Sequence, residues 1–135
     1  MSKKRINDWI APAVQILANT DIAVNGKVDS GYRTQISSFG AAVVMGSLAA
    51  SAASFSQRGR AQVDRSKLLT AMYCLVAETE ERENPEAVLH YICNHDTPET
   101  RSRFMDAAVA LKLAMNFYDL GQEEKKNDES ESTVQ

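Results

Sequence analysis

The feature that most constrains this chain is an uncharged stretch near its middle. Between Arg33 and Arg58 lie 24 residues without a charged side chain. Such a stretch suits a membrane-spanning helix, a helix buried in its own bundle, or a surface that closes on a partner. Here it contains nine Ser, Thr or Gln residues and only seven large apolar ones. It is therefore too polar to prefer lipid, and we interpret it as a closely packed helix of a soluble protein without a membrane partner.

Composition supports a helical fold for the whole chain. With 135 residues, 44% of them hydrophobic, the chain is long enough to build its own core, and it has only three prolines and six glycines. We expect an all-α fold, a compact single-domain bundle of about five to six helices over residues 1–121. Residues 122–135 have almost nothing to bury, which predicts a disordered acidic tail.

Apolar periodicity and capping residues indicate where the helices lie. The first should begin near Asn7 or Asp8, although Pro12 could shift its start. An Asn25–Gly26 turn precedes the second, which is expected from about Ser30 to Gln57. The remaining helices are expected after Asp64, after the pair Asn84–Pro85, and from Thr97–Pro98 to a stop at Gly121.

Charge is unevenly distributed along the sequence. Residues 1–77 hold nine basic and four acidic side chains, whereas residues 78–135 hold six and fourteen. A basic N-terminal part can meet a polyanion even in an acidic chain, although an ordinary solvated surface explains the same count. Basic residues bracket the uncharged stretch and are our candidate RNA-phosphate contacts: Lys27, Arg33, Arg58, Arg60, Arg65 and Lys67.

The sequence gives no support for catalysis. We find no nucleophile elbow, no glycine-rich phosphate loop and no Ser-His-Asp or Cys-His arrangement, so no catalytic residue and no cofactor is predicted. His90, Cys93 and His95 lie close together, but no second ligand pair accompanies them, and we predict no metal site. Cys74 and Cys93 are expected to be reduced thiols, which points to the cytoplasm.

Two segments together resemble a known family. The first is "GYRTQISSFGAAVVMGSLAASAASF" and the second is "ALKLAMNFYDL". Both are similar to the small all-helical subunit of the Cmr-type, or type III-B, CRISPR RNA-silencing complex. Members of that family pair Tyr, Ser-Ser-Phe-Gly-Ala and Gly-x-Leu with a last helix that contains Leu-Lys-Leu-Ala and a nearby Tyr. The matching residues are Tyr32, Ser37, Ser38, Phe39, Gly40, Ala41, Gly46 and Leu48, then Leu111, Lys112, Leu113, Ala114 and Tyr118.

This resemblance implies a non-catalytic subunit of an RNA-guided antiviral effector. Copies of it would stack alongside the backbone subunits that hold the CRISPR RNA and would help to form the channel for the target RNA. Its partners would be other Cmr subunits, further copies of itself, and RNA reached through the complex. Lys112 lies in the matching part of the last helix and is the candidate RNA or interface residue that the resemblance adds.

Two alternatives remain open from the sequence. In the first, the chain is a helical protein-interaction module that forms homo-oligomers through its small-residue face and binds no RNA. In the second, weaker one, it is a metal-dependent helical enzyme that uses His90, Cys93 and His95.

Overall fold

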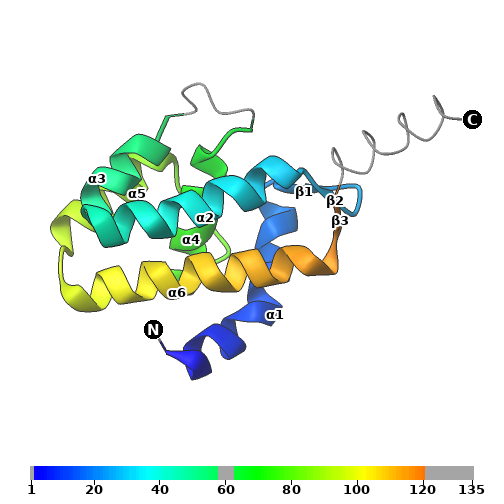
Figure 1. The fold of residues 1–135 in the computed structure, drawn as a ribbon, viewed down its shortest axis with the longest axis horizontal. Coiled ribbons are helices and arrows are strands. Elements are labelled where there is room, and N and C mark those ends of the chain that lie inside the picture. Colours follow the sequence, from blue (N-terminus) through cyan, green and yellow to red (C-terminus); the bar gives the residue numbers. More distant parts are fainter. Residues whose placement is uncertain (1, 58–62, 121–135) are drawn as a thin grey trace, which may run out of the picture.

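The computed structural model describes residues 2–57 and 63–120, and within these ranges the fold is all-α with six α-helices, as predicted. A 3₁₀ turn and three two-residue strands complete it (Figure 1). The tail predicted over residues 122–135 lies outside the described residues. The elements are α1 (Lys3–Asn19), β1 (Ala23–Val24), β2 (Lys27–Val28), α2 (Ser30–Met45), α3 (Leu48–Phe55), α4 (Ser66–Val76), α5 (Pro85–Asn94), α6 (Pro98–Ala114), η1 (Met115–Phe117) and β3 (Asp119–Leu120).

The first helix starts earlier than its apolar pattern suggested. α1 begins at Lys3 because Ser2 caps it, with the Ser2 hydroxyl accepting a hydrogen bond from the Arg5 amide at 3.3 Å. Pro12 lies inside the helix and on its exposed side. The proline ring therefore does not mark the start of the helix.

The single helix predicted from Ser30 to Gln57 is wrong, because the structure divides it into α2 and α3. Gly46 ends α2, and Ser47 caps α3 by accepting a hydrogen bond from the Ala50 amide at 3.0 Å. This break turns the chain back on itself, so that Phe55 of α3 meets Phe39 of α2 edge-to-face with ring centroids 5.1 Å apart.

The other predicted helix starts agree closely with the structure. Asn84 caps α5 and Thr97 caps α6, each followed by a proline in the first turn. Asp29 caps α2 and accepts a hydrogen bond from the Gly31 amide at 2.8 Å. α4 starts two residues after Asp64, whose carboxylate still accepts a hydrogen bond from the Ser66 amide.

The predicted turn at Asn25–Gly26 joins a short hairpin. Both residues have positive φ angles, 54° and 75°, which are required at the two central positions of a type I′ turn. β1 pairs antiparallel with β2, and β2 pairs parallel with β3, bringing Lys27 opposite Asp119. The small sheet therefore joins the start of α2 to the end of α6.

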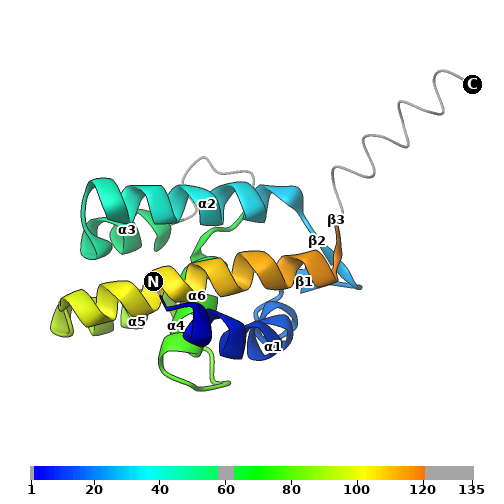
Figure 2. The same ribbon diagram turned by 60° about the horizontal axis from the view of Figure 1, so that its bottom comes forward.

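α6 is the central helix of the bundle. It packs against α2 on one side and against α1 and α4 on the other, and Figure 2 shows it between these two layers. Half of its buried residues are alanines: Ala107, Ala108, Ala110 and Ala114. Because alanine side chains are small, neighbouring helices can approach α6 closely. α2 and α6 run side by side in opposite directions (Figure 1).

The core is built from side chains of all six helices. Its largest fully buried members include Phe39 of α2, Leu68 and Met72 of α4, and Phe104 and Leu111 of α6. In the described ranges we find no helix with both the length and the apolar character needed to cross a membrane.

Candidate nucleic-acid interface

Three of the predicted RNA contacts lie at the end of the molecule where the hairpin meets α6. Arg33 is in the first turn of α2, and its guanidinium donates a hydrogen bond to the side-chain oxygen of Asn116 in η1. Lys112 lies one turn before Asn116, near the end of α6. Lys27 lies in β2, which pairs with the strand that follows η1. We call Lys27, Arg33 and Lys112 the hairpin-end cations.

These cations are open to solvent and largely uncompensated. Lys27 and Lys112 are exposed and Arg33 is half-buried. Within the described ranges, none of the three forms an ion pair. The nearest acidic group by sheet register is Asp119, which lies opposite Lys27 on β3. This end of the molecule is therefore suited to phosphate contact, since each neutralised phosphate releases counterions.

Arg65 has a structural role in the described chain. Its Nη2 donates to the Ser54 carbonyl at 2.8 Å, its Nε donates to the Gln57 carbonyl at 3.1 Å, and its guanidinium lies 5.0 Å from the centre of the Phe55 ring. A cation that bonds the last carbonyls of a helix stabilises that end. Because these contacts hold its guanidinium at the end of α3, and no described contact brings it to the hairpin-end cations, we leave Arg65 out of the interface.

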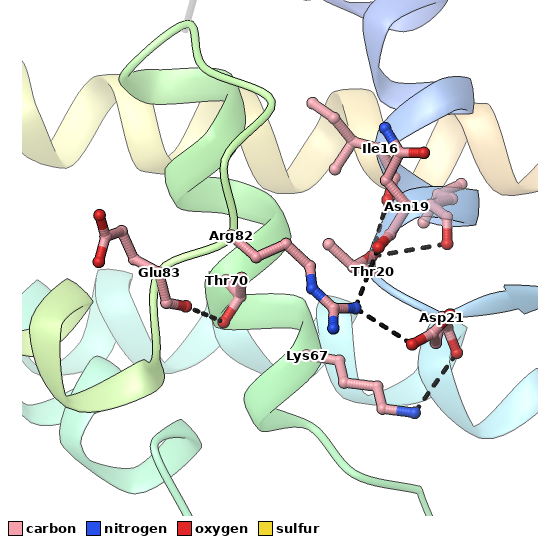
Figure 3. A network of polar contacts seen from close by, with 9 residues as sticks. Ile16, Asn19, Thr20, Asp21, Lys67, Thr70, Arg82 and Glu83 are labelled. Carbon is pink, nitrogen blue, oxygen red and sulfur yellow. Dashed lines mark hydrogen bonds and ion pairs between the residues drawn. The ribbon is translucent and has the colours of Figure 1, made fainter.

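Lys67 belongs to a second polar cluster at the end of α1. Its Nζ approaches the Asp21 carbonyl at 3.4 Å. Arg82 reaches the same place from the loop after α4, where its Nη1 donates to the Asn19 carbonyl at 3.0 Å and to the Asp21 carboxylate at 3.1 Å (Figure 3). A hollow of about 350 Å³ adjoins the cluster. The structure therefore does not bring Lys67 together with the hairpin-end cations by any described contact.

Arg82 was missed in the sequence because it lies in the acidic run "ETEERE". That run forms a loop rather than part of a helix, since α4 ends at Val76. The one local signal is indirect: α1 has no basic residue in its last turn, so its final carbonyls have no cation of their own. The sequence does not tell which distant residue would supply one.

Arg58 and Arg60 lie outside the described residues. Their predicted contact with RNA therefore stays a prediction.

The histidines and cysteines have ordinary structural surroundings. The Nδ1 atom of His95 lies 2.8 Å from the Tyr91 carbonyl, and its ring stacks on the Tyr91 ring. Burial raises the pKa of the Cys74 thiol, so Cys74 is a poor nucleophile at neutral pH. Cys93 is exposed. Among the described residues, no group of three or more His, Cys, Asp or Glu side chains could hold a metal ion.

Comparison of the chain with protein-family models, with curated proteins and with solved structures gave no match.

Proposed function

We propose that this chain is a non-catalytic small subunit of a Cmr-type RNA-guided effector complex. In that complex, copies of it stack along the backbone subunits and the hairpin-end cations contact RNA phosphates. The observation that carries the proposal is that the two segments that resemble the family lie in contact in the fold. The first forms α2 and α3, and the second forms the end of α6 with η1 and β3. α2 packs beside α6, and Lys27, Arg33 and Lys112 lie where the start of α2 meets the end of α6.

The two segments are also tied into the core by the residues that make up the resemblance. Phe39 and Leu111 are fully buried, and the Tyr118 hydroxyl donates a hydrogen bond to the Val14 carbonyl at 2.6 Å. This pattern of residues therefore supports the stability of the α2–α6 pair, while Lys27 and Lys112 at its end stay exposed to solvent. A backbone-holding role fits, because cations neutralise phosphates irrespective of base sequence.

Exposed apolar side chains support the stacking of copies. Val44 and Met45, 71% and 88% exposed, end α2, whereas Leu113, 40% exposed, lies at the end of α6 and Phe117, 70% exposed, lies in η1 just after it. Because α2 and α6 are antiparallel, these two groups lie at opposite ends of the pair (Figure 1). Two unlike patches at opposite ends favour head-to-tail contacts, which build a linear stack rather than a closed dimer.

The same patches also support the alternative function, a homo-oligomerising interaction module that binds no RNA. The two functions differ in their dependence on salt. RNA contact through the hairpin-end cations would weaken steeply as salt rises, whereas apolar stacking would not.

The first test is a charge-removal pair in the reconstituted complex. Lys27→Gln/Lys112→Gln removes two hairpin-end cations, while the control Lys3→Gln/Arg101→Gln removes two exposed cations from elsewhere. Target-RNA affinity measured across a salt series should decrease in the first variant for all RNA sequences. The slope of log K against log salt should become shallower by about 1 for each phosphate that the chain no longer neutralises.

Three outcomes would count against the proposal. Equal effects in both variants would remove the hairpin-end cations from the RNA interface, and a sequence-selective decrease would mean a different contact type. If the complex assembles and binds target RNA equally well without this chain, the proposed function fails and the interaction module is favoured.

A further inference from the structure

A second surface lies on the far side of α6 from α2. A groove of about 670 Å³ runs between α1 and the loop that follows α4. Its apolar floor is formed by Trp9 and Ile16 of α1 and by Leu75 of α4, with Pro12 exposed beside them. The volume falls in the range of specific ligand sites in proteins.

The groove follows most of α1. Both Lys4 and Asn19 line it, and these residues are 15 positions apart on one helix, with Pro12 between them. At 1.5 Å per residue, that distance is at most about 22 Å. An extended polypeptide rises about 3.3 Å per residue, so six or seven residues span the groove. Its length thus favours a peptide segment over one compact small molecule.

At one end of the groove two guanidinium groups lie near the Trp9 ring, next to the Lys4–Asp8 ion pair. The guanidinium groups of Arg5 and Arg103 lie 5.8 and 5.6 Å from the centre of the Trp9 ring. Arg5 donates one hydrogen bond to Asp106, and Arg103 donates one to the Val76 carbonyl. A guanidinium has five N–H donors, so both side chains retain donors for an acidic ligand.

The other end of the groove is acidic. The loop after α4 runs alongside α1, since Arg103 holds Val76 near Trp9 while Arg82 bonds the Asn19 carbonyl. Glu78 and Glu80 lie between these two attachments and line the groove. No ion pair is described for either carboxylate within residues 2–57 and 63–120.

We propose that this groove binds an extended segment of a partner protein with opposite charges at its two ends. Apolar side chains of the segment lie over Trp9, Ile16 and Leu75. An acidic residue meets Arg5 and Arg103, and a basic residue meets Glu78 and Glu80. The charge complementarity fixes which way the segment lies, and the site does not depend on the proposed RNA contact.

The test uses a displayed library of random eight-residue peptides panned against the full chain. Enriched peptides should carry acidic and basic residues toward opposite ends, with apolar residues between them. Glu80→Lys should weaken the binding of the enriched peptides at least about threefold, since one favourable charge pair becomes repulsive. Glu81→Lys is the matched control, because it makes the same charge change one residue away and outside the groove lining.

A second measurement places the bound peptide. Addition of an enriched peptide should shift the NMR signal of the Trp9 indole N–H while leaving the signal of Phe117 unchanged. The proposal is overturned if no peptide is enriched, if Glu80→Lys and Glu81→Lys have equal effects, or if the Trp9 signal does not move.

Discussion

Two Arg–Asp ion pairs hold the two ends of α1, and their surroundings differ sharply. At the N-terminal end, Arg5 lies 2.9 Å from Asp106, a carboxylate of α6 that is completely buried. At the C-terminal end, Arg82 lies 3.1 Å from Asp21, and both side chains are more than half exposed. The same pair of groups therefore acts once inside the protein and once in water.

The difference in solvent exposure decides how much each pair contributes to stability. Besides the guanidinium of Arg5, Asp106 accepts a hydrogen bond from the Ser2 amide at 3.2 Å. A buried carboxylate without its cation cannot regain water, so removal of the cation is costly. The Arg82 and Asp21 side chains are hydrated when apart, and their pairing gains little. Similar distances thus do not mean equal contributions to stability.

The largest effect is expected when Asp106 is left without its cation. Arg5→Met should lower the free energy of unfolding by about 3–5 kcal/mol, because it leaves a buried charge unpaired. Asp106→Asn should cost less, since the Arg5 side chain is 26% exposed and can turn to water. Urea denaturation measures both, with Arg101→Met as an exposed control on α6. A decrease below about 1 kcal/mol for Arg5→Met would contradict the buried-pair interpretation.

The exposed pair should show a smaller effect that depends on salt. Arg82→Met is expected to lower the free energy of unfolding by at most about 1 kcal/mol. This figure includes the loss of the hydrogen bond that Arg82 donates to the Asn19 carbonyl at the end of α1. Measured as a difference from the unmodified chain, this cost should shrink as NaCl is raised to about 1 M, because the charges are screened. The Arg5→Met cost should persist over the same range. If both costs decline equally with salt, the two pairs do not differ in the way described.

The smallest effects concern the left-handed residues that follow two helices. Asp21 after α1 and Glu78 after α4 have φ angles of 60° and 53°, a region that favours glycine. Glu78→Gly should stabilise the protein by up to about 1 kcal/mol. Asp21→Gly should gain less, because it also removes the partner of Arg82. Thermal unfolding of the two variants side by side checks the order, and an equal gain for Asp21→Gly would mean that its ion pair contributes nothing.

Local chemistry allowed part of this fold to be predicted. The caps Asn84 and Thr97 and the turn at Asn25–Gly26 each depend on neighbours within four residues, so the sequence carries the whole signal. The break between α2 and α3 also has local signs, Gly46 and then Ser47. These were hidden because small uncharged residues on both sides of the break give no change of pattern.

The candidate sites were harder to predict because they are made by distant segments. Lys27, Arg33 and Lys112 come together only through the strand pairing and the packing of α2 on α6. Arg65 has the same chemistry as these residues, yet it is used to close α3. Whether a basic residue is available for a ligand depends on such tertiary contacts, and composition cannot reveal it.

The position of α6 has a consequence for how the protein is made. α6 contacts both α1 and α2, and the sheet joins residue 27 to residue 119. These contacts therefore join residues that are far apart in the sequence. Contacts between residues far apart in sequence slow folding, even in helical proteins. During synthesis, α1 can pack against α4 and α2 against α3, but the contacts of α1 and α2 with α6 form only after α6 has left the ribosome. The surface around Lys27, Arg33 and Lys112 is therefore completed only after the residues up to Asp119 have been made.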